Sequence, residues 1–354
     1  MNIPLERTDG QPLYLQVKEY LRGQIENGAF PPGTRLTPTR RLATELGVNR
    51  ITVVNAYAEL ESEENPTYLG AIDIFEAHRA RLIGVPLDED GLRVDLLENL
   101  LVRYRPKIIY TVPTFQNPTG MTMNQERREW LLALARRYGA FIMEDGVCNE
   151  LRYEGTPLPP VKGLDREGRV IYVGSFSKTL LPGIRVGYAD ASGPLYERLV
   201  AAKQSTDLHT PSLMQGAVAE YLETGRYPAH LERIREAYRA RRDVMVACLA
   251  EHLPGDAKWT IPQGGLCLWV SLPGTVSITE LYLAAINYGV AFTVGSVFFP
   301  ERQGPPCLRL TFSANPDSRI EEGIRRLGVA LRERLTEDET RPDVSVFTAS
   351  VPLT

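Results

Sequence analysis

The sequence has few of the residues that build metal sites, disulfide frameworks or membrane spans. Its 354 residues include only four cysteines, Cys148, Cys248, Cys267 and Cys307, and no two of them form a C-x-x-C pair. This pattern argues against a zinc site and favours a reducing compartment. No apolar run approaches the ~20 residues that a membrane helix needs, and the N-terminus has no apolar core of signal-peptide length. We therefore expect a cytoplasmic protein with no membrane segment and no metal.

The sequence also lacks an excess of positive charge. Forty Lys and Arg residues stand against 44 Asp and Glu residues, a net charge of −4. Any contact with DNA must therefore come from a local patch. One such patch lies between Arg35 and Arg50, where Glu45 is the only acidic residue.

Residues 12–62 predict a helical unit. Apolar side chains recur at four-residue spacing over residues 13–25, which gives one buried helix face. Two further helices are predicted, capped by Thr39 and Asn49 and separated only by Gly47-Val48. Two helices joined by so tight a turn are typical of a helix-turn-helix, in which basic groups contact phosphates and the later helix meets base edges.

The rest of the chain predicts an α/β fold. Short apolar runs alternate with helices such as 125–138, which indicates a mostly parallel sheet covered on both faces; the runs are 107–112, 140–143 and 169–174. Further strands at 266–270 and 308–312 with a closing helix indicate a smaller α+β lobe.

These patterns predict four regions. Residues 1–62 form the DNA-binding segment, 63–250 a large domain and 251–335 a small domain. Residues 336–354 lack helical periodicity, and we expect a flexible tail there.

Polar side chains follow three of the predicted strands. Asn117 lies after the first strand, Asp145 after the second and Lys178 after the third. Because the carboxyl ends of parallel strands line one crevice, an amide, a carboxylate and an amine should meet there. Pyridoxal phosphate requires such a set, with a desolvated lysine to bind it covalently and a carboxylate facing its ring nitrogen. The sequence therefore predicts a pyridoxal phosphate site.

The N-terminal segment resembles the GntR family of winged-helix regulators. The resemblance covers "PLYLQVKEYLRGQIENGAFPPGTRL" and "RRLATELGVNRITVVNAYAELE". It implies that Arg40, Arg50 and Thr52 contact an operator in DNA. The family continues into a β-hairpin wing, whereas here residues 60–64 run into unrelated sequence, so we expect the wing to be absent.

The remainder, with "NPTG" and "SFSKTLLPGIRVGY", resembles the fold-type I aminotransferases. Together with the N-terminal segment it resembles the MocR subgroup of GntR regulators. The resemblance implies that Lys178 is the Schiff-base lysine, Asp145 pairs with the ring nitrogen and Asn117 bonds the phenolic oxygen. It also implies that Tyr68 stacks on the ring, that Arg309 binds an amino acid's carboxylate, and that the cofactor phosphate is held by Ser175, Ser177 and Arg185.

Two departures from the family bear on function. The linker and the first strand and helix of the aminotransferase domain, with a phosphate-binding loop, are missing between the third DNA helix and Asn65. Cys148 stands where the family has a tyrosine, either as a redox-sensitive thiol or as an inert buried one. We therefore expect weaker cofactor binding.

Three readings remain open at this point. The first is a homodimeric transcription regulator that binds pyridoxal phosphate and senses an amino acid or another amino compound. The second is a working transaminase. The third is an internally deleted copy with impaired cofactor binding, because a sheet that lacks edge elements violates layer packing.

Overall fold

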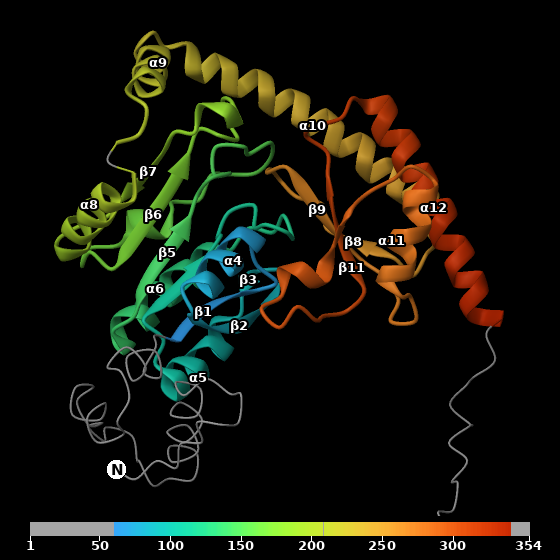
Figure 1. The fold of residues 1–354 in the computed structure, drawn as a ribbon, viewed down its shortest axis with the longest axis horizontal. Coiled ribbons are helices and arrows are strands. Elements are labelled where there is room, and N and C mark those ends of the chain that lie inside the picture. The colour runs from blue at the N-terminus through green and yellow to red at the C-terminus, as the bar shows by residue number, and fades with distance from the viewer. Residues whose placement is uncertain (1–59, 208, 341–354) are drawn as a thin grey trace, which may run out of the picture.

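The structure is a computed structural model that describes residues 60–207 and 209–340. The predicted helix-turn-helix and its DNA contacts Arg40, Arg50 and Thr52 lie outside these residues. Figure 1 shows a large lobe around one sheet and a smaller lobe around another, spanned by the long helix α10.

The large lobe is built on a seven-stranded sheet of order β3-β2-β1-β4-β5-β6-β7. Neighbouring strands from β2 to β6 are parallel, while β3 and β7 pair antiparallel. This confirms the mostly parallel sheet, and the three predicted strands are β4, β5 and β6. The strands are β1 (Leu60–Asn65), β2 (Arg81–Asp88), β3 (Gly91–Leu92), β4 (Ile108–Thr111), β5 (Phe141–Asp145), β6 (Val170–Ser175) and β7 (Gly187–Asp190).

Helices α5 (Val94–Tyr104) and α6 (Gln125–Tyr138) pack on the β2–β5 part of this sheet. Helix α6 begins at Asn124, whose side chain accepts a hydrogen bond from the Arg127 amide, and it ends at Gly139, whose φ of 73° suits glycine. The other helices of the large lobe are α4 (Leu69–Ala77), α7 (Val161–Leu164), the 3₁₀ turn η1 (Pro182–Ile184), α8 (Pro194–Asp207) and α9 (Ser212–Glu223).

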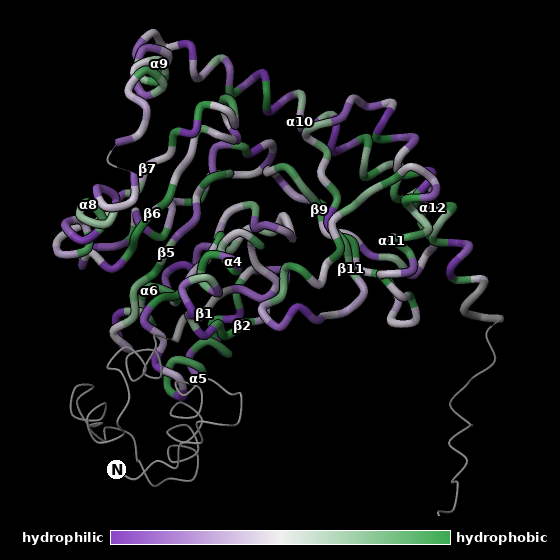
Figure 2. The backbone as a smooth tube through the Cα atoms, viewed as in Figure 1, coloured by the Kyte–Doolittle hydropathy of each residue, from purple (hydrophilic) through white to green (hydrophobic). Residues whose placement is uncertain are grey.

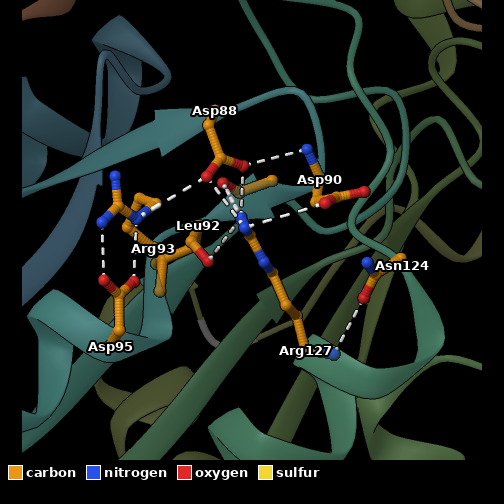
Figure 3. Close-up of polar contacts among 8 residues, drawn as sticks. Asp88, Asp90, Leu92, Arg93, Asp95, Asn124 and Arg127 are labelled. Atoms are coloured by element: carbon orange, nitrogen blue, oxygen red, sulfur yellow. Dashed lines mark hydrogen bonds and ion pairs between the residues drawn. The ribbon is translucent and has the colours of Figure 1, made fainter.

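An ion cluster fixes the β2–β3 hairpin to the start of α6 (Figure 3). The Arg127 guanidinium forms a two-pronged ion pair with Asp88 and also donates to the Gly91 carbonyl oxygen at 2.8 Å. Since Arg127 follows directly on the loop 112–124, the cluster also anchors the end of the loop that holds Asn117.

The small lobe has a four-stranded sheet of order β10-β11-β9-β8. Its helices pack on one core that includes Leu249, Leu281, Leu308 and Leu327, all 1% exposed or less. Figure 2 shows the matching alternation of hydrophilic and hydrophobic residues along α10 and α12. The elements are α10 (Arg226–His252), β8 (Lys258–Trp259), β9 (Cys267–Ser271), α11 (Ile278–Asn287), β10 (Thr293–Val294), η2 (Gly295–Phe298), β11 (Cys307–Thr311) and α12 (Asp317–Thr340).

The elements run across the ends of the predicted regions. Leu60, the third-last residue of the predicted DNA-binding segment, begins β1 and pairs with Arg81 of β2. Helix α10 ends at His252, two residues after the predicted end of the large domain. Helix α12 continues to Thr340, so residues 336–340 are helical and only 341–354 of the predicted tail remain undescribed. Helix α12 packs on α10.

The β7 side of the large sheet is poorly covered. All four residues of β7 are exposed, α8 buries no residue, and α9 buries only Val218. Large apolar side chains such as Tyr188, Val200 and Leu213 are exposed there. Within residues 60–207 and 209–340 no strand pairs with the outer edge of β7. In the same ranges, no helix combines the length and apolarity of a membrane span.

Candidate active site

The carboxyl ends of β4, β5 and β6 meet at one edge of the large sheet. Thr111 lies opposite Glu144 in the β4–β5 register, and Asp145 lies opposite Val173 in the β5–β6 register. Lys178 follows the end of β6 by three residues, in the turn 176–180. Strand topology therefore brings the predicted carboxylate and amine to the same edge, as the spacing indicated.

Asp145 is held by two hydrogen bonds. The Tyr110 hydroxyl donates to Oδ2 at 2.8 Å, and the Val147 amide donates to Oδ1 at 3.1 Å. Burial raises the pKa of Asp145, while both hydrogen bonds lower it. A carboxylate held in this way has a fixed direction and is available to a cationic ring nitrogen.

Lys178 lies close enough to the cleft for its charge to act on two cysteines. The positive charge of Lys178 lowers the pKa of both Cys148 and Cys267, Arg309 acts on Cys267 in the same direction, and Asp145 raises the pKa of Cys148. These five groups, which come from both lobes, therefore lie close enough together to affect one another's charge. The expectation of a desolvated lysine is not met, because the Lys178 side chain is exposed beside the poorly covered β7.

Cys148 behaves as an inert thiol. Burial, together with the nearby Cys267 and Asp145, raises its pKa to about 12. At neutral pH the group is a protonated thiol, whereas redox-sensitive cysteines are thiolates. The structure therefore favours the inert reading of this departure from the family.

Arg309 and Asn117 contact each other although 192 residues separate them. The Arg309 Nη1 donates to Asn117 Oδ1 at 2.9 Å, and its Nη2 donates to Thr293 Oγ1 at 3.4 Å. The guanidinium lies 4.9 Å from the ring centre of Phe298. Its Nε is buried and has no hydrogen-bond partner among the described residues. A half-buried guanidinium with a spare donor is a site for an anion, and a carboxylate suits its fork.

The remaining predicted cofactor residues are arranged around the same edge. Tyr68, 41% exposed, precedes α4 with its ring over Gly70, where a Cβ would come within 2.7 Å of ring carbons. The Ser177 amide and Oγ lie 3.1 and 3.0 Å from Ser175 Oγ. Arg185 is exposed in the left-handed conformation after η1, with φ of 52°.

Sequence reasoning missed a buried network behind Asp145. Glu64 is 1% exposed, and it accepts hydrogen bonds from Thr111 Oγ1 at 2.5 Å and Gln116 Nε2 at 3.1 Å. Burial raises the pKa of Glu64 to about 7, and the charge of Asp145 contributes to the rise. Gln116 Nε2 also donates to the Pro66 carbonyl oxygen at 2.8 Å. The network thus joins the loop of Tyr68 to the loop of Asn117.

No local signal in the sequence identified Glu64. It lies in the charged run Leu60-Glu61-Ser62-Glu63-Glu64, which is atypical of a central strand. Only its place directly before the Asn65-Pro66-Thr67-Tyr68 loop could have linked it to the site.

Comparison with known proteins identifies two families along the chain. The family described as aminotransferase class I and II matches residues 63–327, and the bacterial regulatory proteins of the gntR family match residues 13–65. The last matched residues of the second family, 60–65, form β1 of the large sheet.

Individual relatives fall into two classes. Aromatic-amino-acid aminotransferase 1 of Thermococcus litoralis is 42% identical over 329 residues, covering 92% of this chain and 78% of that protein. The HTH-type transcriptional regulator YdfD of Bacillus subtilis is 34% identical over 270 residues, covering 76% of this chain but only 56% of the regulator.

A solved structure agrees with both the fold and the family. LysN, an alpha-aminoadipate aminotransferase of Thermus thermophilus complexed with N-(5'-phosphopyridoxyl)-L-leucine, superposes with a TM-score of 0.76 at 34% identity, over 91% of this chain and 90% of that one. The chain therefore belongs to the aminotransferase class I and II family and joins that domain to a gntR-family segment, the combination found in the MocR-type regulators.

Proposed function

We propose that the protein is a DNA-binding transcription regulator whose aminotransferase domain binds pyridoxal phosphate through Lys178 and senses an amino compound. The observation that carries the proposal is that Asp145 and Lys178 follow neighbouring strands of one sheet while Asn117 contacts Arg309, in a chain that also has a gntR-family segment. The expected partners are an operator in DNA, an amino acid or similar effector, and a second copy of the chain.

The residues present fit the ring end of this cofactor. Asp145 is fixed in direction for a ring nitrogen, and Asn117 lies at the same edge. Lys178 supplies the amine for covalent attachment, and Tyr68 supplies an aromatic face. Bound pyridoxal phosphate supplies an electron sink that stabilises negative charge at the carbon beside an amine.

The phosphate end has fewer residues to hold it. Ser175, Ser177 and Arg185 offer two hydroxyls and a guanidinium. The family's phosphate loop has no counterpart in the described residues, and a loop at a helix N-terminus is a strong anion site. We therefore expect cofactor affinity well below that of a complete aminotransferase.

Arg309 gives the site its selectivity for an amino acid. Its Asn117 contact fixes the guanidinium, and the spare Nε leaves a donor for a carboxylate. No carboxylate of the described residues forms an ion pair with Arg309. An amino compound with a carboxylate would thus be oriented with its amine toward Lys178.

Two measurements test the proposal. Purified protein with added pyridoxal phosphate should develop a visible absorption band that an amino acid shifts, and Lys178→Ala should lack the band. Arg40→Ala with Arg50→Ala should abolish binding to DNA and leave the band unchanged. A wild-type protein with no band, or with no DNA binding, would refute the corresponding half of the proposal.

A second candidate function is transamination itself. The 42% identity to an aromatic-amino-acid aminotransferase favours it, as does the Arg309–Asn117 pair. An enzyme would transfer amino groups from an amino acid to a keto acid with sustained turnover. A regulator would show the spectral shift with at most a single turnover, so product formation at excess substrate separates the two.

A further inference from the structure

The amino-terminal edge of the large sheet, opposite the candidate active site, is rich in positive charge. Four chain segments enter this edge, and together they hold nine Lys or Arg residues and two acidic residues; the segments are 78–81, 103–107, 136–139 and 165–169. In the whole chain acidic residues outnumber basic ones, 44 to 40. We name these four segments the basic edge.

The loops at the opposite, carboxyl edge have no such excess. Segments 66–68, 112–124, 146–160 and 176–181 hold two basic and two acidic residues. Helix-dipole electrostatics explain the cations in the last turns of α5 and α6, such as Arg103 and Arg136. They do not explain Lys107 or Arg166, which lie beyond the helix ends. The positive charge is therefore a property of this edge of the sheet and not only of the helix C-termini.

Part of this charge is neutralised within the fold and part is exposed. Arg137 pairs with Glu98 at 2.8 Å, and Glu167 lies 3.4 Å from Arg136 and 3.6 Å from Arg169. Lys107, Arg166 and Arg198 of the adjoining helix α8 are exposed, and none of them forms an ion pair with a residue of 60–207 or 209–340.

The basic edge continues into a hollow of about 770 Å³. Its lining includes the cations Lys162, Arg166, Arg169 and Arg198, together with the acids Asp165 and Glu167. The edge from β2 to β6 spans four strand spacings, or about 19 Å. One DNA strand presents a phosphate about every 3.4 Å along the helix axis, so the row matches the length of roughly five phosphates.

The gntR-family segment joins the sheet at this same edge. That segment matches residues 13–65, and the described chain enters the edge at Leu60, whose register partner is Arg81. Two strand spacings, about 10 Å, separate β1 from β5 at the border of the hollow. The gntR-family segment is therefore attached to the aminotransferase domain at the basic edge.

We infer that the basic edge is a second DNA-contacting surface, which binds the phosphate backbone without reading sequence. This inference rests on the proposed DNA binding, which supplies the duplex. The surface adds phosphate contacts from Lys107, Arg166 and Arg198 to those of the gntR-family segment. Such contacts position a duplex and strengthen affinity in a salt-dependent manner.

The test measures binding of the full chain to a random-sequence duplex of about 40 base pairs, twice the span of two adjacent half-sites, across a range of salt. The edge variant is Lys107→Gln, Arg166→Gln, Arg198→Gln. The control variant is Arg226→Gln, Lys258→Gln, Arg319→Gln, which removes the same charge from exposed positions elsewhere. The edge variant should bind about ten-fold more weakly, with the slope of log affinity against log salt smaller by two to three.

Conservative replacement guards against a folding artefact. Arg166→Lys with Arg198→Lys should retain the wild-type slope, and the thermal unfolding midpoints of all variants should agree. An unchanged slope in the edge variant, or an equal loss in the control variant, would overturn the inference. If the edge variant binds normally while Arg40→Ala with Arg50→Ala does not, only the second surface fails. If the wild type binds no DNA, the proposed regulator fails with it.

Discussion

The two flanks of the large sheet differ sharply in how they are packed. On the β2 flank, α5 and α6 bury Leu97, Leu101, Leu131 and Leu132, each 3% exposed or less. On the β7 flank, α8 buries nothing and leaves Val200 39% exposed. Helices of similar length that flank the same sheet thus differ in how many apolar side chains they bury.

The comparison identifies the β7 flank as the less protected side of the large sheet. Within the described residues, no strand lies beyond β7. The β2 flank, by contrast, is complete and is held by the Arg127 cluster of Figure 3. Lys178 and Arg185 lie beside the incomplete flank, and Asp145 ends β5, two strands away from β7.

The largest expected loss of stability comes from a substitution in the well-packed β2 flank. Leu97→Ala removes a fully buried side chain and should lower the free energy of unfolding by about 3–5 kcal/mol. Leu213→Ala on the other flank, at 76% exposure, should change it by less than about 0.5 kcal/mol. Urea unfolding measures both, and similar losses in the two variants would contradict the comparison.

The next effect concerns the buried acid of the complete flank. The pKa of Glu64 is raised from 4.5 to about 7, so the folded state binds this proton more tightly than the unfolded state. The stabilising contribution is complete below pH 4.5 and is lost as the pH rises to about 7. Glu64→Gln should remove this dependence, with a difference of up to about 3 kcal/mol between the ends of the range.

Unfolding curves of wild type and Glu64→Gln at several pH values between 4 and 8 check this prediction. The difference between the two proteins isolates Glu64 from other titrating carboxylates. A constant difference across the range would mean that the pKa of Glu64 is the same in the folded and unfolded states, and would contradict the raised pKa.

A smaller effect comes from the ion cluster. Arg127→Ala leaves Asp88 without its two-pronged partner and should cost about 1–3 kcal/mol. Arg93→Ala removes an exposed pair with Asp95 and should cost less than Arg127→Ala, because solvent screens an exposed pair. Equal losses would show that the hairpin is not fixed through Arg127.

The smallest expected effect is the free energy needed to open the β7 flank locally. Amide hydrogens of β7 and α8 should exchange at free energies well below those of β4 and β5, because few apolar contacts protect them. Native-state hydrogen exchange measures both sets. Equal protection would mean that another part of the chain or a partner covers this flank.

The sequence predicted the elements whose local pattern agrees with their surroundings. The run 107–112, the helix 125–138 and the run 169–174 correspond to β4, α6 and β6 within two residues at each end. Asn124 and Gly139 at the ends of α6 are standard cap residues. Local propensity and tertiary packing favour the same structure in these segments.

Other strands depend on contacts that no local pattern encodes. The sequence of β1 consists mostly of charged and polar residues, and β2 contains Gly84 and Pro86. Both sequences are atypical of strands, yet both strands lie within the sheet. Gly84 is required there because a Cβ would come within 2.6 Å of the Asn65 side chain. The contact between Asn117 and Arg309 was likewise beyond sequence spacing, although each residue was predicted separately for the site.

The central claim is that Lys178 binds pyridoxal phosphate at the edge shared by Asp145 and Asn117. The most direct measurement is peptide mass spectrometry after incubation with pyridoxal phosphate and reduction with borohydride. The account predicts a phosphopyridoxyl group on the peptide that contains Lys178, and none in Lys178→Ala. Labelling confined to other lysines, or spread evenly over exposed ones, would contradict it.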